Sequence, residues 1–328
     1  MRVRVVVNCG AGSVEGNEEQ RREIVDAFAA AQAEAEVTFA QGSDLADAIR
    51  TAADERPDAV VIAGGDGSIG TAAQVLSATD VPLAVLPLGT FNYFAKDIGM
   101  PLDIAEAATS IVQGEVSRID LAEVNGRCFV NNSSVGVYPI MVSLRDQIRE
   151  ERGWGKVRSI PVAAWRVVRR FPVRRMTITA DDYSAHVRSP FVFVGNNRYE
   201  VGPRGVGERS RIDGGQLCAY VTRAESPWRL FLMAVKAISR GSSRVAGLNE
   251  VSVSELVLNV HGHRVMVSLD GESATLRSPL RYRIRPGALA VLATPAPGAT
   301  TGAPTDPSGA DAEPVGHRMS HEAEVPRN

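Results

Sequence analysis

The segment from Ala59 to Ser68, AVVIAGGDGS, constrains the fold more than any other part of the chain. An apolar run ends abruptly in Gly64-Gly65-Asp66-Gly67-Ser68, and a helix-compatible run from Ile69 to Leu76 follows. A strand, a glycine turn and a helix start, in this order, present bare backbone N–H groups to a phosphate. The glycines are expected to allow close approach of the backbone and positive φ angles. Asp66 adds a carboxylate where a phosphate's Mg²⁺ could bind, directly or through water. The segment therefore predicts chemistry on a nucleotide.

A dinucleotide-binding interpretation is disfavoured. Gly65-Asp-Gly-Ser-Ile-Gly70 matches G-x-G-x-x-G, but that fingerprint also needs an acidic residue about 20 residues further on, at the end of the next strand. Here the next expected strand, 82–86, is followed by Pro87-Leu-Gly-Thr90, which contains no acid. Asp66 would also repel a pyrophosphate unless a metal intervened. The match alone does not predict NAD binding.

The composition bounds the class of protein. A chain of 328 residues is long enough for two domains with separate cores. Its net charge of −2 gives no support to nucleic-acid binding. Cys9, Cys128 and Cys218 are odd in number and far apart, which favours a reducing compartment. No apolar run approaches the length of about 18 residues that marks a membrane span. We therefore expect a cytoplasmic protein that can still touch a membrane surface.

The first part of the chain alternates strand and helix patterns. Strands are expected at 3–8, 37–40, 58–63 and 82–86, and helices at 17–36, 43–55, 69–76 and 104–113, with Ser43 as an N-cap. Continuous apolar strands that alternate with helices are typical of a parallel sheet covered on both faces. The pattern predicts an α/β nucleotide-binding domain over residues 1–122.

The pattern changes after residue 116 to short strands in quick succession. These are expected at 127–131, 176–179, 191–194, 217–221, 256–260, 265–269 and 282–284, with one helix at 227–240. They predict a mostly antiparallel β-sandwich over residues 123–293, whose last strand can return to the first domain. Residues 294–328 contain six prolines, four glycines and no Phe, Trp or Tyr. Such a segment cannot offset its ordering entropy, so it is expected to be a disordered tail.

A second loop, Pro87-Leu-Gly-Thr-Phe-Asn-Tyr-Phe-Ala95, also follows an expected strand. Gly89 and Thr90 offer backbone and hydroxyl donors, and Asn92 offers a side-chain amide. Two such turns at the carboxyl ends of nearby parallel strands converge on one crevice, where ligands of open α/β sheets bind. Together they favour a nucleotide-phosphate site over two unrelated structural turns.

These two motifs resemble the diacylglycerol kinase catalytic-domain family, in the branch of bacterial soluble lipid kinases related to sphingosine kinases. The resemblance extends over residues 1 to about 293. Further matching stretches are Asn8-Cys-Gly-Ala-Gly-Ser13, Arg118-Ile-Asp120-Leu121, Gly195-Asn-Asn197, Asp213-Gly-Gly215 and Leu269-Asp270-Gly-Glu272. The first motif alone is shared with NAD kinases and phosphofructokinases, so a first domain similar to theirs is expected.

The resemblance implies transfer of the γ-phosphate of ATP to a hydroxyl of diacylglycerol or a related lipid alcohol. It implies that Asp270 is the general base and that Glu272 beside it serves for orientation or metal. It also implies that Asp66 and Asp120 organise Mg²⁺ through water, and that Asp213 supports a structural metal site. The ATP site would consist of Asn8, Gly64, Gly65, Asp66, Gly67, Ser68, Thr71, Gly89, Thr90 and Asn92.

Alternatives remain open at two places. Asp270-Gly-Glu272 also fits a hairpin turn between 265–269 and the strand near Tyr282, since Asp-Gly is a common turn signal. At position 93 the family commonly has Asp, whereas this chain has Tyr93, and a phenol with a pKa of about 10 cannot replace a carboxylate near Mg²⁺. Asp97 would lie on the same face of a helix and could compensate. A catalytically impaired nucleotide- or lipid-binding protein and a NAD kinase are the alternative functions.

A lipid kinase must reach its substrate. Residues 145–175 carry ten Lys or Arg against three Asp or Glu, with Trp154, Trp165 and Phe171 among them. Such a segment can bind anionic headgroups, at about 1 kcal/mol per basic residue near the surface, but a solvated basic helix has the same pattern. We expect a lipid substrate at the inner membrane surface and no nucleic-acid partner, and the resemblance suggests a homodimer.

Overall fold

The computed structural model describes residues 1–9, 14–152, 171, 173–180, 183–202, 205–209, 211–222, 226–229, 232 and 248–293, which belong to one compact unit. The predicted tail at 294–328 lies outside these residues. Most of the predicted helix at 227–240 and of the basic stretch at 145–175 also lies outside them. None of the helices that the structure describes is long and apolar enough to cross a bilayer.

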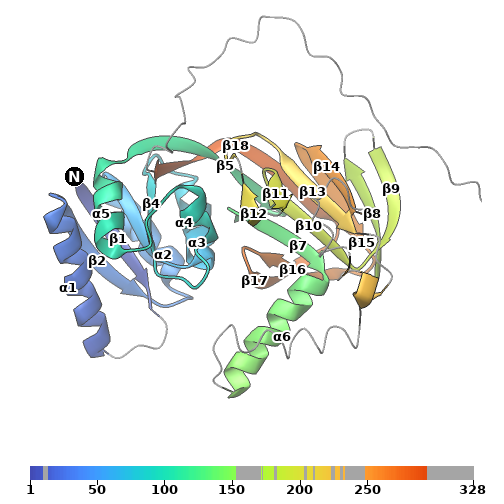
Figure 1. The fold of residues 1–328 in the computed structure, drawn as a ribbon, viewed down its shortest axis with the longest axis horizontal. Coiled ribbons are helices and arrows are strands. Elements are labelled where there is room, and N and C mark those ends of the chain that lie inside the picture. Colours follow the sequence, from blue (N-terminus) through green and yellow to red (C-terminus); the bar gives the residue numbers. More distant parts are fainter. Residues whose placement is uncertain are drawn as a thin grey trace, which may run out of the picture. The chain divides into compact units, whose positions relative to one another are not determined.

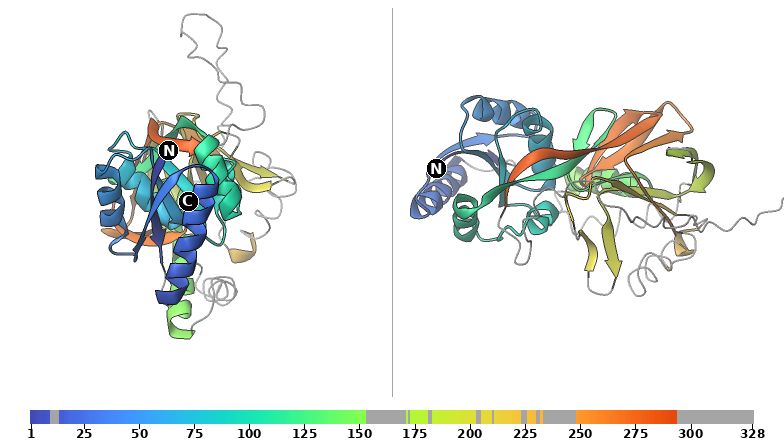
Figure 2. Two further views of the ribbon diagram at one scale, coloured as in Figure 1. Left: turned by 90° about the vertical axis from the view of Figure 1, so that its left-hand side faces the viewer. Right: turned by 90° about the horizontal axis from the view of Figure 1, so that it is seen from above.

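Four parallel strands form the first part of the fold, in the order β2-β1-β3-β4. They are β1 (Arg2–Asn8), β2 (Glu34–Ala40), β3 (Ala59–Gly64) and β4 (Leu83–Pro87). The helices between and after them are α1 (Val14–Ala30), α2 (Leu45–Asp54), α3 (Asp66–Leu76), α4 (Tyr93–Asp97) and α5 (Ile104–Gln113). Helix α1 packs beside α5 on one face of the sheet and α2 beside α3 on the other (Figures 1 and 2). The predicted α/β architecture is confirmed.

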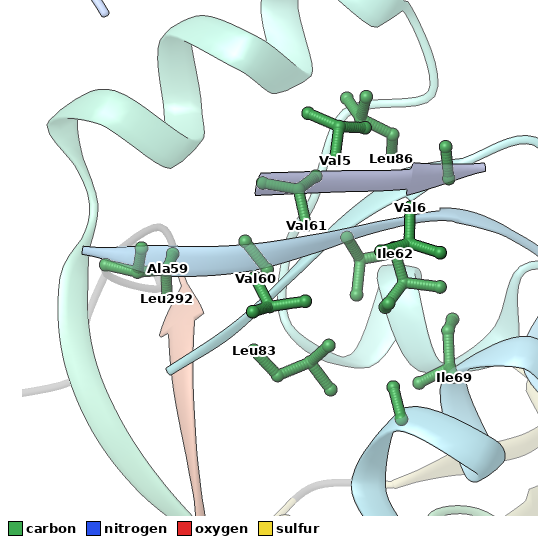
Figure 3. Packing of buried hydrophobic residues seen from close by; sticks show 14 of the residues in the cluster. Val5, Val6, Ala59, Val60, Val61, Ile62, Ile69, Leu83, Leu86 and Leu292 are labelled. Carbon is green, nitrogen blue, oxygen red and sulfur yellow. The ribbon is translucent and has the colours of Figure 1, made fainter. Parts of the chain in front are cut away.

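The apolar strands fold this way because both faces of the sheet are covered. Every residue of β3 and β4 is buried, and side chains such as Val61 and Ile62 pack among those of neighbouring strands and of α3 (Figure 3). A strand buried on both faces needs an unbroken apolar run, which is what the sequence shows. The sheet therefore holds the carboxyl ends of β3 and β4 rigidly side by side.

Several helix boundaries differ from the prediction, and α3 begins at Asp66, three residues before the expected start. The expected helix at 17–36 ends at Ala30, because Glu34–Glu36 belong to β2 and pair with β1. Parallel pairing overrides the local helix preference of this Ala/Glu-rich segment. Helix α2 begins at Leu45, and the expected N-cap Ser43 instead donates its hydroxyl to Asp44 Oδ1 at 3.0 Å.

Asp103 caps α5, and its loss is expected to destabilise the protein. Its Oδ1 accepts hydrogen bonds from the backbone N–H groups of Ala105 at 2.9 Å and Glu106 at 3.0 Å. Asp103→Ala should lower the free energy of unfolding by about 1 kcal/mol in urea denaturation. Asp44→Ala is the matched control, because Asp44 holds the same position on α2 without a side-chain cap bond. Equal losses in both variants would contradict the capping role.

The second part of the fold is a β-sandwich, as predicted. A six-stranded antiparallel sheet has the order β14-β13-β10-β7-β16-β17. Its strands are β7 (Asn132–Gly136), β10 (Phe191–Asn196), β13 (Leu217–Thr222), β14 (Leu248–Val253), β16 (Arg264–Leu269) and β17 (Glu272–Arg277). It shares one core with the antiparallel part of the first sheet. Helix α6 (Val137–Arg152) follows β7, and β11 (Tyr199–Gly202) pairs with β12 (Gly205–Arg209).

One long strand joins the two parts of the fold. Strand β18 (Leu280–Ala293) pairs antiparallel with β5 (Glu115–Val124), and it reaches β4 through the parallel pair Val291 and Leu83 (Figure 2). It also pairs with β15 (Glu255–Val260), which continues the sheet into β8 (Arg174–Ala180) and β9 (Tyr183–Ser189). Strand β6 (Arg127–Phe129) pairs with β5. The first sheet therefore extends through both parts, and the predicted boundary at residues 122 and 123 falls within β5. The domain division stays a prediction.

Candidate functional site

The two predicted glycine loops meet at one edge of the parallel sheet. Strand β3 ends at Gly64 and β4 at Pro87, and these two residues are register partners. A Cβ atom added to Gly89 would lie only 2.5 Å from the Cα atom of Gly65. Because ligands of open α/β sheets bind beyond the carboxyl ends of the strands, the loops together form one candidate ligand-binding edge. Their predicted convergence is confirmed.

Neighbouring atoms approach the glycines of the two loops so closely that a side chain would not fit. Positive φ angles are found at none of the four, which are Gly64, Gly65, Gly67 and Gly89. A Cβ atom on Gly64 would lie 2.8 Å from Ser68 Oγ, and one on Gly67 would lie 1.9 Å from Glu272 Oε1. The expectation of positive φ was therefore wrong, whereas the expectation of close approach is confirmed.

Asp66 ties the first loop to the second. Its Oδ1 accepts hydrogen bonds from the backbone N–H of Phe94 at 2.9 Å and from Asn131 Nδ2 at 3.1 Å. Its Oδ2 faces the backbone N–H of Tyr93 at 3.3 Å. The carboxylate thus satisfies N–H groups in the first turn of α4, which have no partner within that helix. Asp66 fixes the distance between the two loops, whatever further role it has.

The other residues predicted around the first loop line two neighbouring cavities, a larger one of about 870 Å³ and a smaller one of about 390 Å³. Asn8 donates its Nδ2 to Ser68 Oγ at 2.7 Å, and both residues line the larger cavity together with Thr90. Thr71 donates its hydroxyl to the carbonyl of Gly67 at 3.1 Å, within its own helix, and lines the smaller cavity. The structure therefore separates Thr71 from the predicted nucleotide ligands.

Asn92 braces the second loop from inside. It is buried in the left-handed region, with φ at 51°. Its Oδ1 accepts the backbone N–H of Gly89 at 2.9 Å, and its Nδ2 donates to the carbonyls of Gly89 at 2.9 Å and Pro87 at 3.1 Å. Asn92 does not line the larger cavity. It shapes the loop that does.

Asn92→Ala is expected to loosen this loop. Alanine loses three hydrogen bonds and tolerates positive φ poorly, so unfolding free energy should fall by about 2 kcal/mol. Asn92→Gly separates the two causes, because glycine accepts the φ angle but makes no side-chain bond. In urea denaturation we expect an intermediate loss for Asn92→Gly. If both variants unfold at the same urea concentration as the wild type, the loop does not depend on this side chain.

Asp270 sits in a tight hairpin turn and reaches into the site at the same time. Asp270 and Gly271 have φ angles of 47° and 84° and connect β16 to β17, as in a type I′ turn. The Asp270 carboxylate accepts backbone N–H groups of Val130 at 2.8 Å, Asn131 at 2.8 Å and Asn132 at 3.0 Å. The predicted hairpin turn is confirmed, although the strand after it is β17 and not the one near Tyr282. Asp270 also lines the candidate site, and its role as a base stays a prediction.

The environment of Asp270 sets its protonation. Burial raises the pKa of the Asp270 carboxyl to about 7, against the lowering by its three backbone N–H donors. The negative charge of Asp66 raises the pKa further. A carboxylate with a pKa close to neutral is suited to accept a proton and to release it again.

The larger cavity brings the loops and the hairpin together. Its volume is about 870 Å³. It is lined by Asn8, Gly65–Ser68, Leu88–Phe91, Tyr93, Asn131, Asn132, Tyr138, Met141, Val142 and Asp270–Ser273. Its lining thus combines residues of both glycine loops, the carboxylates Asp270 and Glu272, and Tyr138, Met141 and Val142 of α6. A neighbouring cavity of about 390 Å³ shares Gly67, Asp270 and Glu272.

The carboxylates that the resemblance assigns to metal ions have different surroundings. Asp120 is buried, and its oxygens accept Asn197 Nδ2 at 3.0 Å and the backbone N–H groups of Gly215 at 2.6 Å and Gly287 at 3.0 Å. Asp213 is exposed and pairs with Arg211. Within the described part of the chain, no three His, Cys, Asp or Glu side chains are placed to hold a metal ion. The assignments of Asp66 and Asp120 to Mg²⁺ through water, and of Asp213 to a separate structural metal site, stay predictions.

Tyr93 and Asp97 also lie differently from the expected compensation. The Tyr93 ring is half exposed and stacks on Phe91 with centroids 5.6 Å apart. Asp97 points instead to Arg209, whose Nε donates to Asp97 Oδ2 at 2.9 Å. Asp97 lines neither cavity, so it does not replace a carboxylate at position 93.

Sequence reasoning missed Asn131 and Arg209. Asn131 contacts Asp66 and Asp270, and Arg209 contacts Asn131. Asn131 is the last residue of the strand expected at 127–131, whereas the observed strand β6 ends at Phe129. A polar residue at the end of an apolar run was a usable signal. Arg209 stands 78 residues further along the chain, and no local pattern marks it.

Comparisons with known proteins agree with this geometry. The family model described as diacylglycerol kinase catalytic domain matches residues 2–124. A diacylglycerol kinase of Mycobacterium tuberculosis is 40% identical over 87 residues, which cover 25% of this chain and 28% of that protein. A diacylglycerol kinase of Bacillus subtilis is 38% identical over 96 residues, which cover 28% of this chain and 32% of that protein. These matches therefore span less than a third of either curated relative.

Two longer similarities extend over most of the chain. A probable YegS-like lipid kinase of Pseudomonas aeruginosa is 29% identical over 292 residues, covering 85% of this chain and 91% of that protein. The crystal structure of a putative diacylglycerol kinase from Bacillus anthracis has a TM-score of 0.70 at 23% identity. It covers 90% of this chain and 98% of that one. The structural likeness shows that the two-part fold is shared.

Proposed function

Because this chain belongs to the diacylglycerol kinase catalytic-domain family, we propose that it is a lipid kinase that transfers the γ-phosphate of ATP to a lipid hydroxyl. Diacylglycerol or a related lipid alcohol is the proposed acceptor. One observation carries the proposal: the glycine loops and the Asp270–Glu272 turn line one cavity of about 870 Å³. Phosphate-binding backbone and a base for the acceptor are the two protein elements that such a transfer needs.

The phosphates of ATP would lie against the first turn of α3. The N-terminus of a helix offers unpaired N–H groups and the positive end of its dipole. Gly65, Gly67 and Gly89 line the cavity there, and a side chain at any of them would meet neighbouring protein atoms. Mg²⁺ would neutralise charge on the phosphates and would arrive with them, since it is commonly held by substrate phosphates with few protein carboxylates.

Asp270 would take the proton of the acceptor hydroxyl. The hydroxyl oxygen then forms a bond to the γ-phosphorus, the bond from that phosphorus to the bridging β–γ oxygen breaks, and ADP leaves. Glu272 lies on the same cavity wall, against Gly67, and would orient the acceptor. Position, protonation and exclusion of water are what the chain itself contributes.

The rate should therefore depend on pH around neutrality. Asp270 must be deprotonated to act, and burial raises its pKa to about 7. The value of kcat/KM should be constant above this pH and should fall about tenfold per pH unit below it. Initial rates from pH 5 to pH 9, with the folded fraction checked by circular dichroism, measure this. An acid limb near pH 4, the usual range of an aspartate, would contradict the assignment.

Reaching a lipid requires contact with a membrane. We place this role with residues 145–175, on sequence grounds alone, because of their ten basic residues and interleaved aromatics. The protein should sediment with anionic vesicles more than with neutral ones. Equal sedimentation with both would contradict membrane binding through these basic residues. A homodimer, also proposed from the resemblance, is measured by analytical ultracentrifugation.

A panel of acceptors tests the proposed function. Diacylglycerol, a sphingoid base and a prenyl alcohol are each presented in mixed micelles with labelled ATP. Label in one lipid supports a kinase and names its acceptor. ATP binding without transfer to any lipid would favour a catalytically impaired binding protein, an alternative motivated by the exposed phenol of Tyr93 where the family commonly has a carboxylate. The NAD kinase alternative is disfavoured by the family to which the chain belongs.

A further inference from the structure

Arg209 is a buried cation whose donors are all used. The side chain is 1% exposed and comes from the end of β12. Its Nη1 donates to the carbonyls of Val130 at 2.7 Å and Asn196 at 3.0 Å, and its Nη2 donates to Asn131 Oδ1 at 3.0 Å. Nε and Nη2 both reach Asp97 Oδ2. The planar guanidinium thus makes five hydrogen bonds at once, which is a geometry specific to arginine.

This arrangement decides which way the Asn131 amide points. Because Asn131 Oδ1 accepts from Arg209, its Nδ2 must face the other way, where it donates to Asp66 Oδ1 at 3.1 Å. A flipped amide would set its NH₂ against the guanidinium and its oxygen against the carboxylate. Arg209 therefore fixes the amide orientation in which Asn131 Nδ2 donates to Asp66.

Arg209 and Asp270 hold the same short backbone segment from two sides. Arg209 donates to the carbonyl of Val130, while the N–H groups of Val130, Asn131 and Asn132 donate to the Asp270 carboxylate. Donation to a peptide carbonyl strengthens the donor at the other end of that peptide, which is the Asn131 N–H. The position of the Asp270 carboxylate consequently depends on the position of Arg209.

We propose that Arg209 is a positioning residue that acts through Asn131 and the backbone of residues 130–132 to hold Asp66 and Asp270 in their places in the site. The proposal rests on the proposed function, since it concerns the same cavity. Arg209 lines neither cavity and therefore does not touch a substrate held there. Arg209 also pairs with Asp97 at the end of α4. Asp66 accepts hydrogen bonds from the first turn of the same helix, so Arg209 and α4 belong to one network.

The test uses Arg209→Lys. Lysine keeps a positive charge beside Asp97, which avoids leaving a buried carboxylate unpaired, but its ammonium cannot reach all the acceptors of a planar fork. We expect kcat to fall by up to about 100-fold, as for a misplacement of about 1 Å, with the KM for ATP changed much less. Arg283→Lys is the matched control, since Arg283 makes a two-bond ion pair with Glu123 at the surface. That variant should keep wild-type kcat.

A second comparison separates positioning from plain stability. If Arg209 acts through Asn131, the double variant Arg209→Lys, Asn131→Ala should lose no more kcat than the worse single variant, because residues in one network are non-additive. Losses that multiply, or a wild-type kcat for folded Arg209→Lys, would overturn the proposal.

A readout independent of turnover keeps the proposal separate from the proposed function. The backbone ¹H–¹⁵N resonances of Val130, Asn131 and Asn132 report their bonds to Asp270. They should shift in Arg209→Lys and stay in place in Arg283→Lys. Unchanged resonances in Arg209→Lys would overturn the positioning role. If the wild-type protein phosphorylates no lipid, yet these resonances shift in Arg209→Lys, the kinase is refuted and the positioning role is retained.

Discussion

Replacing Asp270 by asparagine should reduce phosphate transfer to lipid by about 10³-fold, within the range that general bases contribute. The change removes the proposed base and leaves Glu272, the other carboxylate of this turn, in place. Asparagine suits the left-handed φ of 47° at this position, so the turn itself is expected to survive. ATP affinity, measured by calorimetry, should stay within a few-fold of wild type, because the phosphates are bound by the glycine loops.

The loss of charge at Asp270 needs its own control. One of the backbone N–H groups of residues 130–132 would face the new NH₂ group, so a moderate loss of stability is expected. Asp103→Asn removes the same charge from the α5 cap while keeping an accepted N-cap residue, and it should retain wild-type turnover. Full activity in folded Asp270→Asn would show that another group is the base.

Gly89→Ala should abolish measurable ATP binding, because it forces the two loops apart. Its Cβ atom would lie 2.5 Å from Gly65 Cα and 2.6 Å from Asn92 Oδ1. Gly65 is backbone next to a packed helix and cannot rotate away. The overlap must move one loop, at a cost of about 1–3 kcal/mol in stability, and it displaces the N–H groups that would bind phosphate.

Gly42→Ala is the matched control for Gly89→Ala. A Cβ atom on Gly42 would meet nothing within 4 Å, and the residue lies between β2 and α2 and lines neither cavity. Calorimetry should show wild-type ATP affinity for Gly42→Ala and a loss of at least about 100-fold for Gly89→Ala. Similar affinities in both variants would mean that the contact between the loops does not shape the nucleotide site.

The sequence predicts those parts of the site that follow from local pattern and from the rules of parallel sheets. Gly64–Ser68 and Gly89–Asn92 follow neighbouring apolar strands, so their convergence can be expected from the residue pattern alone. Asp270 could be placed in the site only through resemblance, because the turn lies on another sheet. The choice between turn and active-site residue was artificial, since a residue of a type I′ turn can also present a carboxylate to a cavity.

The remaining features could not be predicted because they depend on contacts between distant residues. No sequence pattern indicates that Asp120 accepts hydrogen bonds from Asn197, Gly215 and Gly287, which are far apart along the chain. Thr71 follows the glycine loop but turns its hydroxyl back into its own helix. The hydrogen bond between Asn131, just before β7, and Arg209, at the end of β12, joins residues far apart in the chain. No periodic pattern of the sequence indicates such a contact.

The most direct measurement of the central claim follows the label of ATP into lipid. Wild-type protein is incubated with diacylglycerol micelles and either γ-labelled or α-labelled ATP, and the extracted lipid is counted. Transfer in the cavity of Asp270 and the glycine loops predicts lipid label from γ-labelled ATP alone, lost in both Asp270→Asn and Gly89→Ala. Lipid label that persists in both folded variants, or release of γ-label only as free phosphate with every acceptor of the panel, would contradict it.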